Sequence, residues 1–155
     1  MRIGVSTAKG LCYALDKPLI AVETLEAMAG GLITRGVDKD ALLCPMIDAR
    51  RMEVYTALFD ATGNRVQPTA AEIIDANSFS AKLQQNKIVF FGDGAPKCQE
   101  TLSGNTNALF IDDFTNSAVH LTKGSYQKFQ TGQFEDVAYY EPYYLKDFLV
   151  GAKKA

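Results

Sequence analysis

The pattern of hydrophobic and polar positions predicts that the chain is organised around a β-hairpin at residues 42–59. Residues 42–47 form an unbroken apolar run, which is typical of a central strand that is covered on both faces. Residues 53–59 alternate instead, and their β-branched and aromatic side chains suit a pleated surface. Pro45 has no backbone N–H, so the first strand must tolerate a gap in its hydrogen bonding on one side.

A helix is predicted at residues 2–15, because small and apolar residues recur there at helical spacing. They form two stripes, one of Ile3, Thr7 and Leu11 and one of Val5, Ala8, Cys12 and Leu15. A helix that is apolar nearly all round is normally buried. Gly4 and Gly10 each cost about 1 kcal/mol relative to alanine, which suggests that another surface approaches closely. Two interpretations stay open: a helix cut from something longer, or a frayed terminal helix packed on its own domain.

The remaining segments predict a third strand and then alternating helices and strands. Pro68 places the strand at residues 66–74 at a sheet edge. The other predicted elements, bounded by turn and cap residues, are an extended link at 18–22, a helix at 25–35 capped by Thr24 and ended by Gly36, a turn at 61–64, a helix from Asn77 or Ser78 to 85, a strand at 88–91, a helix from Pro96 to 102, a strand at 108–111 and a helix from Asn116 to Gly132. Three strands followed by two helix-linked strands predict an α/β fold, the ribonuclease-H-like arrangement of a mixed five-stranded sheet with flanking helices.

Composition narrows the class of protein. At 155 residues, with 47% hydrophobic and 22% charged residues, the chain fits one ordinary domain. Its net charge of −2 gives no general attraction to nucleic acid or to anionic membranes. No apolar run is as long as a transmembrane helix, and no signal peptide opens the chain. Cys12, Cys44 and Cys98 form neither a disulfide framework nor a zinc motif, so we expect reduced thiols in a cytoplasm.

Catalytic motifs find little support. There is no G-x-S-x-G nucleophile motif, and the single His120 lies within the last predicted helix without an obvious partner. No cluster of His, Cys, Asp or Glu has metal-ligand spacing. A ribonuclease-H nuclease needs several carboxylates around its metal ions, whereas only Asp48 follows the first strand. The residues therefore argue against a nuclease.

Two loops could meet an anion. Residues 92–95, Gly-Asp-Gly-Ala, lie between a strand and a helix start, where backbone N–H groups point outward, although Asp93 would repel phosphate. The hairpin tip with Arg50 and Arg51 is the second candidate, and a solvated turn is the alternative favoured for it. The tail after Phe134 is rich in tyrosine; these rings could stack on bases, but no basic groove surrounds them, so packing against the sheet is preferred.

Several segments together resemble one known family, the TsaB family (also called YeaZ). They are Arg2-Ile3-Gly4 leading to Ala8-Lys9-Gly10-Leu11, Ile20-Ala21-Val22 with Thr24-Leu25, Ile47-Asp48-Ala49-Arg50 with Glu53-Val54-Tyr55, Gly92-Asp93-Gly94-Ala95, and Glu141-Pro142 with Tyr144-Leu145-Lys146. Their order and spacing match across nearly the whole chain. The resemblance implies a lobe of the actin-like ATPase superfold, which has two ribonuclease-H-like lobes.

The resemblance also implies a function. TsaB is the non-catalytic partner of TsaD in making threonylcarbamoyladenosine in tRNA, and TsaE, an ATPase, joins the pair. We therefore expect a scaffold subunit rather than an enzyme, in the cytoplasm, with tRNA met only indirectly through the complex and no membrane contact. No cofactor is implied for this chain; ATP binding at the interface of the complex would be weak or absent in the chain alone.

Matched residue by residue, the family's two nucleotide loops fall on Asp48, Arg50 and Arg51 and on Gly92, Asp93, Gly94 and Ala95, and both are expected to be vestigial. The first helix matches the family helix that packs against TsaD or a second TsaB, through Ile3, Gly4, Thr7, Ala8, Gly10 and Leu11. Because family members carry a first lobe before this point, residues 1–40 are expected to be its helical remnant with the connection between lobes, and residues 41–155 the second lobe with its tail. A homodimer is expected when the chain is alone.

An enzyme is the alternative, because older naming treated relatives as glycoproteases and the superfold often binds ATP. The sequence speaks against it, since no HxxxH metal pair and no intact phosphate loop is present. An interaction module for some other partner is the third hypothesis.

Overall fold

The computed structural model describes residues 2–145 of the chain. In order along the sequence, the elements are α1 (Arg2–Leu15), α2 (Thr24–Arg35), β1 (Leu42–Asp48), β2 (Glu53–Phe59), β3 (Arg65–Ile73), α3 (Ser80–Leu83), β4 (Ile88–Phe91), α4 (Ala95–Leu102), β5 (Ala108–Ile111), the 3₁₀ turn η1 (Ala118–His120) and α5 (Leu121–Gln130). Among the described residues, no helix is long and apolar enough to cross a membrane.

The five strands form one mixed sheet in the order β3-β2-β1-β4-β5. Strand β2 runs antiparallel to both β1 and β3, whereas β4 is parallel to β1 and β5 is parallel to β4. The ribonuclease-H-like arrangement predicted from the sequence is confirmed. Strand β1 is central, as its apolar run predicted, and β3 is the edge strand that Pro68 indicated, with register shifts opposite Leu58.

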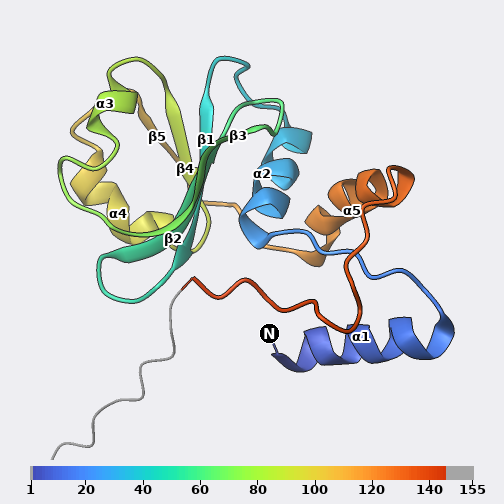
Figure 1. Cartoon of the computed structure of the whole chain (residues 1–155). Coiled ribbons are helices and arrows are strands. Elements are labelled where there is room, and N and C mark those ends of the chain that lie inside the picture. Colours follow the sequence, from blue (N-terminus) through green and yellow to red (C-terminus); the bar gives the residue numbers. More distant parts are fainter. Residues whose placement is uncertain (1, 146–155) are drawn as a thin grey trace, which may run out of the picture.

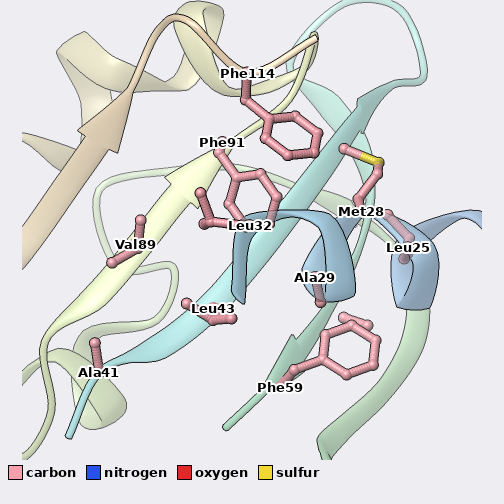
Figure 2. Packing of buried hydrophobic residues seen from close by; sticks show 11 residues of the cluster. Leu25, Met28, Ala29, Leu32, Ala41, Leu43, Phe59, Val89, Phe91 and Phe114 are labelled. Atoms are coloured by element: carbon pink, nitrogen blue, oxygen red, sulfur yellow. The ribbon is translucent and has the colours of Figure 1, made fainter. Parts of the chain in front are cut away.

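Helix α2 covers one face of the sheet, as Figure 1 shows. Its apolar side of Leu25, Met28, Ala29 and Leu32 packs on residues that alternate inward from β1, β2 and β4, together with Phe114 (Figure 2). The inward residues are Leu43, Phe59, Val89 and Phe91, and none is more than 7% exposed. Burial of this size is the main favourable contribution to folding, at about 25 cal/mol per Å² of apolar surface.

The opposite face of the sheet carries α3 and α4 (Figure 1). The core on this face is built from the residues of the same strands that point the other way, together with two residues of α4. They are Cys44, Met46, Val54, Leu58, Ile88 and Phe90 from the strands, and Cys98 and Leu102 from α4. The recorded β1–β2 pairs lie on either side of Pro45, at Leu43–Phe59 and Met46–Thr56. The Thr56 hydroxyl donates to the Pro45 carbonyl at 2.9 Å, so the acceptor of this residue is satisfied, while its ring nitrogen has no hydrogen to donate.

Several predicted caps were wrong: α2 and α3 begin without a side-chain cap, and a neighbouring serine caps the last helical segment. Thr24 is the first residue of α2 rather than its cap. The helix expected from Asn77 or Ser78 is only α3, because both residues bond to the Asp75 carboxylate in a turn. Ser117, not Asn116, caps the last helical segment by accepting from the Val119 N–H at 3.3 Å.

Helix α1 has the predicted bounds but not the predicted burial. None of its residues is buried within the part of the chain that the structure describes. Figure 1 shows α1 apart from the sheet, beside the chain that follows α5. The expectation that an all-round apolar helix is buried was therefore wrong for this chain by itself.

Candidate functional site

The two loops predicted as vestigial nucleotide loops lie together at one end of the sheet. Strands β1 and β4 are parallel neighbours, so the residues after Asp48 and after Phe91 leave the same edge. The Asp48 N–H donates to Asp93 Oδ1 at 3.2 Å, and the Gly94 N–H donates to the Met46 carbonyl at 3.1 Å. The structure thus joins Asp48 with Asp93 and Gly94, which are 45 or more residues away in sequence.

Glycines allow this close approach. At Gly92, φ is +99°, and an added Cβ would lie 2.5 Å from both the Met28 Cε atom and the Met46 carbonyl oxygen. At Gly94, an added Cβ would lie 3.0 Å from the Ile47 carbonyl carbon. The Gly-x-Gly pattern is therefore required for packing of the loop against β1, with or without a ligand.

The anion-binding groups of these loops are occupied by the protein itself. The Asp93 carboxylate accepts from the Asp48 N–H, and the Asp48 carboxylate accepts from the Arg50 N–H at 2.8 Å. Lys97, in the first turns of α4, forms an ion pair with Asp48 and donates to the Glu53 carbonyl at 2.7 Å. An approaching phosphate would meet two carboxylates, and the nearest lysine is already paired.

Arg50 and Arg51 form the hairpin tip with φ values of +71° and +50°. Such values are uncommon for residues other than glycine, asparagine or aspartate, so the tip is locally strained. Hydrogen bonds from Lys97 and from the Arg50 N–H hold the pKa of Asp48 below its ordinary value of 3.8. The carboxylate therefore stays charged, which disfavours a second anion in the loop.

Helix α1 presents a second candidate site. Of the six residues predicted to contact a partner, Ile3, Gly4, Thr7, Gly10 and Leu11 are exposed and Ala8 is half-buried. Ile3 is 85% exposed and Leu11 is 57% exposed, which is unusual for large apolar residues on one stripe. Nothing in the described part of the chain lies within 4 Å of a Cβ added at Gly4 or Gly10, so no surface within residues 2–145 uses the close approach that they permit.

The tail lies beside α1 rather than on the sheet. Arg2 Nε donates to the Tyr144 hydroxyl at 3.3 Å, and Lys9 Nζ donates to the Tyr140 carbonyl at 2.8 Å. Tyr139, Tyr143 and Tyr144 are between 50% and 84% exposed, so the predicted packing of the tyrosines against the sheet was wrong. The end of the tail, including Lys146 and Phe148, lies outside the described residues.

Two positioning residues, Lys97 and Lys9, escaped the sequence analysis, and the placement of His120 differs from the prediction. Lys97 and Lys9 make their contacts across 44 and 131 residues of sequence, so no local pattern marks them. His120 does not lie within α5 but ends η1, where its ring packs at 5.0 Å from Phe114 and against Gly31. This placement is structural, and its buried Nδ1 has no hydrogen-bond partner in the described chain.

No group of three or more metal-ligating side chains gathers anywhere in residues 2–145. A shallow hollow of about 260 Å³ lies between α2 and the segment that precedes α5. It is lined by Thr24, Ala27, Asn116, Ser117, Ala118 and Leu121, and none of these residues is charged. The hollow therefore offers a ligand no ionic contact.

The fold defines a class of protein: a ribonuclease-H-like lobe of the actin-like superfold, in which the loops that follow β1 and β4 are bonded to their own side chains. Residues 1–143 match the family model described as TsaD: tRNA N6-adenosine threonylcarbamoyltransferase. The chain belongs to this family.

Individual relatives place it nearer to TsaB. The tRNA threonylcarbamoyladenosine biosynthesis protein TsaB of Bacillus subtilis is 46% identical over 59 residues, a stretch that covers 38% of this chain and 24% of that protein. A crystal structure from Pseudomonas aeruginosa, described as similar to the peptidase YeaZ, has a TM-score of 0.78 at 19% identity. YeaZ from the same organism has a TM-score of 0.70 at 18% identity.

The two solved structures cover 94% and 93% of this chain, and the chain covers 67% of each of them. Together with the match to TsaB, they confirm the resemblance to the TsaB (YeaZ) family stated from the sequence. They also confirm the fold class, and they connect the chain with threonylcarbamoyladenosine biosynthesis. The proposed division at residue 40 stays a prediction, although α2 packs on the sheet of the segment that follows.

Proposed function

We propose that this chain is a non-catalytic scaffold subunit that binds a TsaD-type protein during tRNA N6-threonylcarbamoyladenosine modification. The name of the Bacillus relative and the family match support the pathway. TsaE and tRNA would be met through the complex, and the cytoplasm is where that complex would act. Alone, the chain would pair with a second copy.

The observation that carries the proposal is the exposed stripe of helix α1. Ile3 and Leu11 are exposed on a helix that has no buried residue within the described chain. Residues four apart lie on the same side of a helix, so Ile3, Thr7 and Leu11 form one continuous strip. An exposed strip of this kind is typical of a protein-binding surface.

The test is a binding measurement between this chain and the TsaD protein of the same organism. Biolayer interferometry should show saturable binding of the wild type, and Thr7→Arg should weaken it strongly because a charge would enter the apolar contact. Ser6→Arg is the matched control, since Ser6 is also exposed but lies off the strip. Absence of wild-type binding, or equal binding by Thr7→Arg, contradicts the proposal.

A nucleotide-binding enzyme is the second candidate function, because the fold class is that of the actin-like ATPases. The filled loops argue against it: the Asp48 and Asp93 carboxylates accept the hydrogen bonds that a phosphate would need. Calorimetry with ATP and Mg²⁺ separates the two. We expect no saturable heat, and a Kd tighter than ~10 μM, about 7 kcal/mol, would favour a working nucleotide site.

A further inference from the structure

Polar contacts join α1 to the tail, and two of them go to one short turn. Lys9 Nζ donates to the carbonyl of Ala138 at 3.1 Å and to that of Tyr140 at 2.8 Å. A second contact lies at the start of the helix, where the Arg2 guanidinium is 5.6 Å from the centroid of the Tyr144 ring. No side chain of α1 is fully buried within the described chain, and Val5, Ala8 and Cys12 are half-buried, so these polar contacts act together with partial apolar packing to position the helix.

The turn at residues 136–140 is itself fixed. The Asp136 carboxylate accepts from the Ala138 N–H at 2.7 Å and from the Tyr139 N–H at 3.1 Å. The Tyr140 N–H donates to the Asp136 carbonyl at 2.8 Å, which closes the turn. With its N–H groups bonded inside the turn, the carbonyls of Ala138 and Tyr140 are left to face Lys9.

The turn is also tied to the chain that precedes α2. The Glu135 N–H donates to the Leu19 carbonyl at 2.8 Å, in an isolated antiparallel bridge between these two residues. Leu19 is only 7% exposed, so this anchor is fixed in the body of the protein. The path of contacts therefore runs from the buried Leu19 through the turn to Lys9.

The geometry points to a latch: the turn at residues 136–140 grips Lys9 and holds α1 so that its exposed strip is presented to a partner. Residues two apart lie on nearly opposite sides of a helix, so Lys9 faces away from Thr7 and Leu11. Lys9 is thus a positioning residue, which fixes one side of α1 and leaves the other free. This inference rests on the proposed function, because it concerns the same binding surface.

A pre-positioned helix binds more tightly, because less freedom is lost when the complex forms. The ammonium group suits this role, since hydrogen bonds to a charged donor are stronger than neutral ones. Lysine also offers several donors at once, which matches two carbonyls. Release of the latch should therefore loosen α1 without disturbing the sheet.

The first experiment measures hydrogen exchange in the free chain by mass spectrometry. Lys9→Met keeps the stem and the helix propensity but removes the donors. We expect amides of α1 to exchange about tenfold faster, the effect of losing a charge-assisted hydrogen bond, while peptides from β1 and β4 stay unchanged. Lys17→Met, at an exposed lysine just after α1, is the matched control and should change nothing.

A double-mutant cycle identifies the turn as the partner of Lys9. Asp136→Ala removes the carboxylate that accepts from the Ala138 and Tyr139 N–H groups, so it should loosen the turn and speed α1 exchange as Lys9→Met does. The double variant should then be no faster than either single variant, because both break the same contact. Lys9→Arg keeps the charge and should restore most of the protection. Unchanged exchange in Lys9→Met, or additive effects in the double variant, overturns the latch.

The second experiment measures the affinity of the same variants for the TsaD-type protein. Lys9→Met should bind about tenfold more weakly at an unchanged Tm, and Lys9→Arg should recover binding. Faster exchange with unchanged affinity overturns the positioning role. If the wild type does not bind at all, the proposed function fails, and the exchange data decide the latch separately.

Discussion

Asp48, Asp93 and Lys97 join the loops that follow β1 and β4 into a closed structural joint. Each carboxylate accepts a backbone N–H from the loops, and the lysine bridges the Asp48 side chain to the Glu53 carbonyl. The same residue types could bind Mg²⁺ and phosphate in another arrangement. Here they bind one another, so two consequences can be measured.

The first concerns acid stability. Because the folded pKa of Asp48 is lowered from 3.8, its ion pair stabilises the fold fully above that ordinary value and loses its effect as pH falls through the lower folded pKa. Lys97→Met should therefore be less stable than the wild type at pH 7, and the difference should narrow below about pH 4. It should not vanish, since Lys97 also bonds a carbonyl that does not titrate.

Urea unfolding from pH 7 to pH 3 measures this difference. Lys123→Met is a suitable control, because Lys123 is exposed on α5 and distant in sequence from the joint. A constant difference between wild type and Lys97→Met across the pH range would show that the ion pair contributes nothing to the stability of the loops.

A second measurable consequence is that Gly92, in the loop that carries Asp93, cannot accept a side chain. Gly92→Ala should destabilise the protein by about 2 to 3 kcal/mol, because the new methyl group meets the Met46 carbonyl at a positive φ. Gly104→Ala is the control, since nothing lies within 4 Å of its added Cβ. Thermal or urea unfolding measures both, and equal stability of the two variants would contradict the packing requirement.

Helix α1 is the element whose properties conflict most with its surroundings. It is apolar on one strip, held by a polar latch on the other side, and unburied within the described chain. Gly4 and Gly10 would weaken it as an isolated helix by about 1 kcal/mol each. A second surface that packs closely over α1 would explain both the exposed apolar strip and the two glycines.

Self-association should use this strip. The wild type should form dimers at high protein concentration, and Thr7→Arg should lose a few kcal/mol of association if the position becomes buried. Ala8→Arg tests the same contact, but Ala8 is already half-buried within the chain, so Thr7 is the cleaner site. Light scattering at matched concentrations, with Ser6→Arg as control, measures the effect; a monomeric wild type would refute the dimer.

The molecule as a whole has a core that does not include α1. Both hydrophobic clusters are built from α2, α4, the central strands and their connecting segments. Folding of the sheet layer should therefore be nearly independent of the first helix, while partner binding depends on it.

Deletion of residues 1–15 tests this division. The shortened chain should keep its Tm within a few degrees, because no buried side chain of α1 is lost, and should lose self-association. Leu32→Ala is the opposite case. It should lower the free energy of unfolding by about 2 to 5 kcal/mol, because Leu32 is 2% exposed in the core, and it should leave α1 intact. A large loss of Tm on deletion would place α1 in the folding unit.

The sequence alone determined the elements and their order, because hydrophobic periodicity and the punctuation by proline and glycine are local properties of the chain. The apolar run at residues 42–47 identified the central strand, and Pro68 identified the edge. The caps at Thr24 and Asn116 failed because α2 starts one residue earlier than predicted, without a side-chain cap, and Ser117 rather than its neighbour caps η1. Tertiary structure decided the rest: that Asp48 meets Asp93 and Lys97, that Lys9 meets the tail, and that α1 stays exposed. Those contacts join residues 44 to 131 positions apart, where no pattern in the sequence specifies which groups will meet.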